Sequence, residues 1–284
     1  MILKDVQTPN RNAGSLSAVG QPIMEDDFMK SFIPWVGGKS QLCKTVFSHF
    51  PEQKPDRYIE AFGGGGSLLF YQQKHAPLEV FNDIDGHLIN LYRCVQHHCG
   101  EVQRELRLGG EQVPPNSREL FFDSLEQLNM RGLTDIQRAA RYFYVIRISY
   151  GADRRTFGCS KKALHSAIDR LPEIQERLKD VVIENRDFAG LIKTYDRKNA
   201  LFYFDPPYFQ AEQCYDGFSP SDHGRLYGCI SGLKGQFVLS YNDHPEIRTL
   251  YKDFHIHEVE RSSPLIHKHG AGPANYKELI ITSH

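Results

Sequence analysis

Four consecutive glycines, Gly63 to Gly66, constrain the fold of this chain more than any other feature. They follow a short apolar run at residues 57–62, which predicts a strand, and precede residues 67–73, which predict a helix. Because glycine lacks a Cβ atom, its backbone can turn sharply and approach a ligand closely. A strand, a glycine-rich turn and a helix in this order are typical of open α/β folds.

Six further short runs predict strands, at residues 79–83, 181–184, 201–204, 236–240, 255–260 and 278–282. The runs at 181–184 and 201–204 are almost wholly apolar, as in strands buried on both faces of a mostly parallel sheet. Residues 88–95 carry apolar side chains at helical spacing. The alternation predicts a three-layer α/β fold with a mostly parallel seven-stranded sheet.

Two segments interrupt this pattern. Residues 97–180 are polar and helical, with breakers at Gly109-Gly110 and Pro114-Pro115, so we expect an inserted, mainly helical module. Residues 1–28 lack periodicity and predict a leader outside the fold. The sheet domain is therefore expected to comprise residues 29–96 and 181–284.

The charge distribution says more than the net charge of −1. Residues 137–162 contain seven basic side chains and one acidic side chain, interleaved with five aromatic ones. Such a mixture suits a phosphate backbone and unstacked bases, although a solvated helix face would look the same. The nucleic-acid-binding candidates within this segment are Arg147, Tyr150, Arg154, Arg155, Lys161 and Lys162.

The six cysteines form no Cys-x-x-Cys pair, so neither a zinc ribbon nor a disulfide framework is predicted. Cys94, His97, His98 and Cys99 lie close together in sequence, but adjacent histidines on a helix point apart, and we expect no metal site. The sequence contains no apolar run of the roughly 18 residues that a membrane span needs. The expected location is the cytoplasm.

A second motif, Asp205-Pro206-Pro207-Tyr208, directly follows the predicted strand at residues 201–204. The Asp205 carboxylate and the Pro206 carbonyl can accept hydrogen bonds from the two N–H groups of an adenine amino group, whose lone pair is otherwise conjugated with the ring. The prolines stiffen the loop, and Tyr208 offers a face on which an extruded base can stack. These four residues are the catalytic candidates.

Two parts of the sequence resemble nucleotide-binding motifs. Asp83 ends the second predicted strand, where a carboxylate can accept hydrogen bonds from ribose hydroxyls. This layout serves both NAD and S-adenosylmethionine (SAM). Gly38-Lys39-Ser40 ends like an NTPase phosphate-binding loop, but that pattern needs glycine where this chain has Ile33, so the NTPase interpretation fails.

Four motifs in order give the chain its family resemblance: Pro34-Trp-Val-Gly-Gly-Lys39, Phe62-Gly-Gly-Gly-Gly-Ser67, Asn82-Asp-Ile-Asp85 and Asp205-Pro-Pro-Tyr208. Together they resemble the Dam-type, alpha-class, adenine-specific DNA methyltransferases, from about Ser31 to the C-terminus. The resemblance implies a Rossmann-like, SAM-dependent methyltransferase fold with a reversed last strand. It also implies that the enzyme transfers the SAM methyl group to the 6-amino nitrogen of a flipped adenine in double-stranded DNA.

The resemblance also implies roles for single residues. Trp35 and Lys39 would line the methionine end of SAM, and Asp83 would bind the ribose. Further cofactor-binding residues would be Phe62, Gly63, Gly64 and Gly65 beneath the cofactor, with Asp187 and Phe188 at its adenine. The insert departs from the family pattern, because Ser149 to Gly158 lack the Asn-Gly turn that many members carry. A DNA-contacting role for the insert is expected, but no particular target sequence.

Other functions remain open from the sequence alone. They are an NAD-linked oxidoreductase, a DNA-binding relic without activity, and variants that act on RNA or on the 4-amino group of cytosine. The expected partner is double-stranded DNA, with a cognate restriction endonuclease as a further candidate, and we expect a monomer.

Overall fold

The computed structural model describes residues 28–107, 112–159, 163–215, 217–262 and 275–284. The predicted leader lies outside these ranges except for Phe28. Two of the nucleic-acid-binding candidates, Lys161 and Lys162, also lie outside them.

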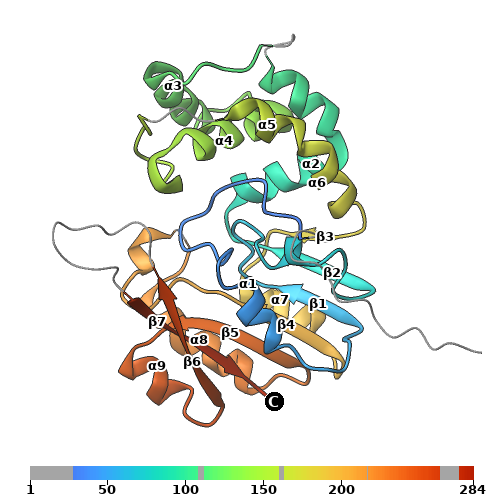
Figure 1. Ribbon diagram of the computed structural model, residues 1–284, viewed down its shortest axis with the longest axis vertical. Coiled ribbons are helices and arrows are strands. Elements are labelled where there is room, and N and C mark those ends of the chain that lie inside the picture. The colour runs from blue at the N-terminus through green and yellow to red at the C-terminus, as the bar shows by residue number, and fades with distance from the viewer. Residues whose placement is uncertain (1–27, 108–111, 160–162, 216, 263–274) are drawn as a thin grey trace, which may run out of the picture.

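The described residues form one seven-stranded sheet in the order β3-β2-β1-β4-β5-β7-β6 (Figure 1). The strands are β1 (Arg57–Glu60), β2 (Leu78–Asn82), β3 (Val182–Glu184), β4 (Ala200–Phe204), β5 (Gln236–Asn242), β6 (His255–Ser262) and β7 (Asn275–Thr282). β7 is antiparallel to both of its neighbours, and every other pairing is parallel. The predicted mostly parallel sheet with a reversed last strand is confirmed.

The strand order places a crevice between β1 and β4. From β1 the chain continues outward to β2 and β3, whereas β4 lies on the other side of β1 and leads outward to β5. Open α/β sheets bind ligands at such a switch point, beyond the carboxyl ends of the strands. The glycine turn follows β1 and Asp205 follows β4, so both predicted motifs meet at this crevice.

Alternate residues of the central strands point to two hydrophobic clusters, one on each face. On β4, Leu201 and Tyr203 pack into the first cluster, while Phe202 and Phe204 pack into the second. The second cluster lies under α7 (Phe188–Tyr195), α8 (Pro220–Ser231) and α9 (Pro245–Leu250). The first lies under α1 (Cys43–Ser48) and α2 (Gly86–Leu106). The result is the expected three-layer α/β fold.

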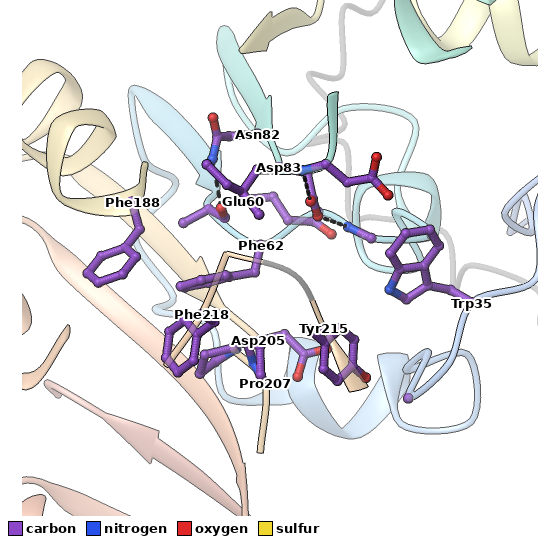
Figure 2. Close-up of a pocket in the computed structure, with 18 of the residues that line it drawn as sticks. Trp35, Glu60, Phe62, Asn82, Asp83, Phe188, Asp205, Pro207, Tyr215 and Phe218 are labelled. Carbon is purple, nitrogen blue, oxygen red and sulfur yellow. Dashed lines mark hydrogen bonds between the residues drawn. The ribbon is translucent and has the colours of Figure 1, made fainter. Parts of the chain in front are cut away.

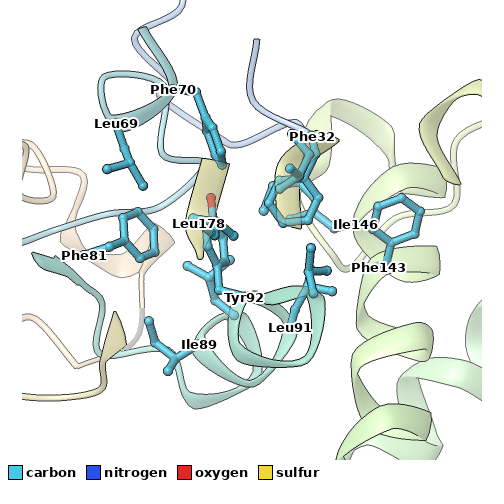
Figure 3. Packing of buried hydrophobic residues seen from close by; sticks show 14 of the residues in the cluster. Phe32, Leu69, Phe70, Phe81, Ile89, Leu91, Tyr92, Phe143, Ile146 and Leu178 are labelled. Atoms are coloured by element: carbon cyan, nitrogen blue, oxygen red, sulfur yellow. The ribbon is translucent and has the colours of Figure 1, made fainter. Parts of the chain in front are cut away.

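The predicted insert is mainly helical, with α3 (Arg118–Leu128), α4 (Asp135–Ile148), α5 (Leu164–Asp169) and α6 (Leu171–Leu178). It shares its core with the sheet, because Phe81 of β2, Phe143 of α4 and Leu178 of α6 belong to the same buried cluster (Figure 3). α2 crosses the predicted boundary at residue 97, and its backbone leaves helical geometry at His98 (φ −135°, ψ 36°). The division into two modules stays a prediction.

One predicted helix was wrong. Residues 67–73 contain only a 3₁₀ turn, Leu69–Tyr71, and Gln72 is extended. Leu68, Leu69 and Phe70 are all buried, which no single helical face allows. The side chain of Arg177 also donates hydrogen bonds to the carbonyl oxygens of Leu69 and Gln72, at 2.7 and 2.9 Å. Packing from a distant helix therefore decides the conformation of this segment.

Within the described ranges, no helix is long and apolar enough to cross a bilayer. In the same part of the chain, no three His, Cys, Asp or Glu side chains are grouped as ligands of a metal ion.

Candidate active site

A pocket opens at the carboxyl ends of β1, β2 and β4 (Figure 2). All thirteen residues predicted for catalysis or cofactor binding line it: Trp35, Lys39, Phe62, Gly63, Gly64, Gly65, Asp83, Asp187, Phe188, Asp205, Pro206, Pro207 and Tyr208. The sheet brings these residues together from distant parts of the sequence.

The glycine turn closes on Asp83 and Trp35. The Gly64 N–H donates to Asp83 Oδ2 at 2.8 Å, and the Asp85 N–H donates to Asp83 Oδ1 at 2.9 Å. Gly64 has φ +50°, and a Cβ atom there would lie 2.6 Å from Trp35 Nε1, so only glycine fits. Burial raises the pKa of Asp83 to about 6. The carboxyl group is thus held in a fixed orientation at the pocket.

Asp205 forms an ion pair with Lys39, with 2.7 Å between Lys39 Nζ and Asp205 Oδ1. Lys39 Nζ also donates to the Gly37 carbonyl at 3.1 Å and lies 4.7 Å from the centroid of the Tyr208 ring. The Lys39 side chain is 3% exposed and that of Asp205 19%, so this pair is largely removed from water. Lys39 therefore orients the predicted catalytic carboxylate, a contact that the sequence did not indicate.

The antiparallel strand β7 contacts the hydroxyl group of Tyr208. The Tyr208 hydroxyl donates to Glu278 Oε2 at 2.6 Å, and Glu278 is buried on β7. Burial raises the pKa of the Tyr208 hydroxyl well above its usual range. The ring is fixed both by this hydrogen bond and by the Lys39 ammonium near its face.

Glu60 also lines the pocket, although it is not among the residues predicted from the sequence. It is buried at the end of β1 and accepts a hydrogen bond from the Tyr58 hydroxyl at 3.0 Å. Burial raises the pKa of Glu60 to about 8. Its position at the carboxyl end of a central strand, directly before the glycine motif, was the signal that could have identified it.

Three phenylalanines form an apolar wall of the pocket. The ring centroids of Phe62, Phe188 and Phe218 lie 5.5 to 6.1 Å apart in pairs. Phe218 was not predicted, since it lies in an irregular segment with no local pattern.

Asp187, another predicted cofactor-binding residue, lies at the start of α7. It caps this helix by accepting a hydrogen bond from the Ala189 N–H, and it forms an ion pair with Arg225 at 2.7 Å.

Described residues of the segment after Tyr208 line the pocket, and a buried polar network holds this part of the chain. His223 Nε2 lies 2.6 Å from Glu212 Oε1, and His223 Nδ1 lies 2.5 Å from the Tyr241 hydroxyl. Farther along, the Tyr215 hydroxyl donates to the Val36 carbonyl at 3.2 Å. Tyr215 and Phe218 from this segment line the pocket (Figure 2).

The nucleic-acid-binding candidates separate into different environments. Arg147 is partly buried and donates to the Phe32 carbonyl at 3.4 Å, which ties it to the scaffold. Arg154 lines the pocket and pairs with Asp85 at 2.5 Å. Tyr150 and Arg155 are exposed. The structure thus leaves two of the four described candidates at the surface.

Comparisons with known proteins match most of this chain. A family model described as "D12 class N6 adenine-specific DNA methyltransferase" matches residues 35–263. The chain is 29% identical to the Type II methyltransferase M1.LlaDCHI of Lactococcus lactis subsp. cremoris, over 90% of this chain and 96% of that protein. It is 24% identical to the Type II methyltransferase M.MjaIII of Methanocaldococcus jannaschii, over 81% and 91% of the two chains. It is also 24% identical to a DNA adenine methylase of Vibrio cholerae serotype O1, over 88% and 95%.

Proposed function

This chain belongs to the D12 class N6 adenine-specific DNA methyltransferases, and from that premise we propose which residues bind the methyl donor, the target base and the DNA. Family membership confirms the resemblance inferred from the four motifs and favours it over an NAD-linked oxidoreductase. The observation that carries the residue assignments is the convergence of the glycine turn, Asp83 and Asp205–Tyr208 on one pocket.

SAM is the proposed methyl donor. The side chains present fit it: the Asp83 carboxylate retains lone pairs for the ribose hydroxyls, and Phe62, Phe188 and Phe218 offer an apolar wall to its purine. Trp35 and Lys39 are assigned to the methionine end. When bound, SAM supplies an electrophilic methyl group on a positively charged sulfur.

The target adenine is assigned to Asp205, Pro206, Pro207 and Tyr208. Because the 6-amino group is base-paired inside a duplex and cannot enter the pocket there, the adenine must leave the base stack to reach this loop. The Asp205 carboxylate and the Pro206 carbonyl then accept hydrogen bonds from the two amino N–H groups, which turns the nitrogen lone pair toward the incoming methyl group. Lys39 keeps the carboxylate oriented, and the negative charge of Asp205 stabilises the positive charge that develops on the nitrogen.

Double-stranded DNA is assigned to the insert, at the turn of residues 149–158. Its two exposed candidates for DNA binding are Tyr150 and Arg155, whose side chains are suited to contact bases and phosphates. Lys161 and Lys162 stay candidates from the sequence. Arg147 and Arg154 are instead assigned to the scaffold and to the pocket rim, because their guanidinium groups already have protein partners.

In the cell, we place the enzyme in the cytoplasm as a monomer. Among the side chains that the structure describes, Cys43, Cys94, Cys99, Cys159 and Cys229 are free thiols, as is typical of a reducing compartment. Two of the relatives carry the name Type II methyltransferase, which supports a pairing with a cognate restriction endonuclease.

The test is to express the chain in cells that lack adenine methylation and to map N6-methyladenine by sequencing their DNA. Wild type is expected to methylate adenine within one short sequence, and the Asp205→Ala variant is expected to methylate none. The matched control is Asp253→Asn. It changes an exposed carboxylate that does not line the pocket, and this variant should methylate like wild type. Absence of methylated adenine with wild type, or methylation by Asp205→Ala, would refute the assignment.

A further inference from the structure

The turn at residues 149–158 has an unusual backbone. Gly151, Ala152 and Arg154 all have left-handed φ angles, of 56°, 63° and 57°. For alanine and arginine this conformation is strained, and it persists only where the surrounding structure imposes it. The partners of the Arg154 side chain therefore bear directly on the shape of the turn.

Arg154 makes three contacts outside its own turn. Its Nη1 atom lies 2.5 Å from Asp85 Oδ2 and 2.8 Å from the Tyr142 hydroxyl, which itself donates to Asp85 Oδ2 at 2.8 Å. The guanidinium carbon lies 4.8 Å from the centroid of the Trp35 ring. The side chain thus joins the turn to α4, to the start of α2 and to the segment before α1.

Two of these partners lead directly to Asp83. The Asp85 N–H donates to Asp83 Oδ1, and the Trp35 indole packs against Gly64, whose N–H donates to Asp83 Oδ2. Arg154 is consequently connected to the proposed ribose-binding carboxylate by two separate routes, and all of these residues except Tyr142 line the pocket. Its neighbour Arg155 is exposed and does not line the pocket.

We propose that Arg154 is a positioning residue that couples SAM in the pocket to DNA on the turn, an inference that rests on the proposed function. A ligand in the pocket restrains Trp35 and Asp83 and so steadies the surface on which Arg154 lies. The turn is then held in its strained shape, with Tyr150 and Arg155 presented to DNA. Bound SAM is thereby expected to raise the affinity for DNA by a coupling factor. By thermodynamic linkage, bound DNA must raise the affinity for SAM by the same factor.

The experiment measures this factor directly. The dissociation constant of sinefungin, a SAM analogue that transfers no methyl group, is determined by calorimetry with and without a duplex that carries the mapped target sequence. For wild type, DNA is expected to tighten sinefungin binding about 5- to 150-fold, the usual range of such coupling. Arg154→Gln is expected to bring the factor close to 1 while each ligand still binds alone.

The matched control is Arg155→Gln, which should weaken DNA binding but keep the wild-type factor. Asp85→Asn retains the oxygen that caps α2 and should also lower the factor, with no further loss in the double variant Asp85→Asn/Arg154→Gln. If thermal unfolding shows that Arg154→Gln is not folded, Arg154→Lys replaces it. That variant keeps the charge but not the planar group over Trp35, and a factor below wild type is expected.

Three outcomes overturn the inference. If wild type binds sinefungin and methylates DNA but the factor is 1, the coupling is absent while the proposed function stands. If the folded Arg154 variants keep the wild-type factor, the coupling runs through other residues. If wild type neither binds sinefungin nor methylates DNA, the proposed function itself fails, and the inference fails with it.

Discussion

Two arginines reach from the helical insert to carboxylates of the sheet domain, and they do so in different ways. Arg177 on α6 forms a two-pronged pair with Glu79, at 2.8 and 2.9 Å, and also bonds two carbonyl oxygens. Both side chains of this pair are at most 5% exposed. Arg154 meets Asp85 through one nitrogen at the pocket rim, and both side chains are more than 20% exposed.

The difference teaches that the same ion pairing can serve as an anchor or as an adjustable contact. The buried, fully bonded pair cannot open without leaving a charge in an apolar environment, so it fixes the insert on the sheet. The partly exposed pair can open toward water at small cost, so it can respond to what occupies the pocket. The variants below test this distinction, starting with the largest expected effect.

Arg177→Met is expected to lower the free energy of unfolding by about 3–5 kcal/mol, because Glu79 is left buried without its partner. Arg154→Met should cost only about 1 kcal/mol or less, since its pair is partly exposed. Urea unfolding of both variants and wild type measures the two costs. Equal costs would remove the distinction between anchor and adjustable contact.

Asp205→Asn is expected to slow methyl transfer without changing either arginine ion pair. The variant keeps the shape of the side chain but loses the charge that stabilises the reacting nitrogen, and about 100- to 1000-fold slower methyl transfer is expected. Sinefungin affinity should hardly change, because the carboxylate is assigned to the base. Single-turnover methylation of a duplex with the mapped target measures the rate, with Asp253→Asn as the control. A wild-type rate would contradict the role of Asp205.

Glu60 is a buried carboxyl that, unlike Glu79, has no ion-pair partner among the described residues. Burial raises its pKa and outweighs a hydrogen bond from the Tyr58 hydroxyl, a backbone hydrogen bond from Leu69 and the charge of Arg177, which all lower it, so its folded pKa of about 8 exceeds the ordinary value of 4.5. The folded state therefore holds a proton that the unfolded state releases between these pH values. Stability should fall as pH rises through this window, by up to about 1.4 kcal/mol per pH unit.

The Glu60→Gln variant cannot titrate and should lose this part of the pH dependence. The free energy of unfolding of the variant minus that of wild type should therefore be larger at pH 9 than at pH 5. Urea unfolding at both pH values provides the measurement. An identical pH profile in the two proteins would show that Glu60 titrates normally in the folded state.

Arg155→Ala carries the smallest expected effect. If its guanidinium touches one phosphate, the slope of log K for DNA against log salt concentration should shrink by about 0.9. Arg154→Gln should leave the slope unchanged, because Arg154 is assigned to Asp85 rather than to DNA. Titrations of one duplex at several salt concentrations compare the two variants. Equal slopes in both would erase the difference assigned to these neighbours.

The sequence by itself determined the sheet and the membership of the pocket. Short apolar runs predict buried strands, and in an α/β sheet the residue that follows a strand lies at the ligand-binding edge. For this reason Gly63, Asp83 and Asp205 could be assigned to one site without knowledge of their contacts. The ordered motifs identified the methyltransferase family, which the family comparison confirmed.

Only the tertiary structure decided which charged groups meet. Lys39 pairs with Asp205, and Tyr208 with Glu278, although the partners lie far apart in the sequence, and no local pattern encodes such contacts. Arg154 and Arg155 are neighbours in sequence, yet one lies at the pocket and the other at the surface. The physical reason is that periodicity fixes local conformation, whereas the partner of a side chain depends on long-range packing and, here, on a turn whose residues have left-handed φ angles.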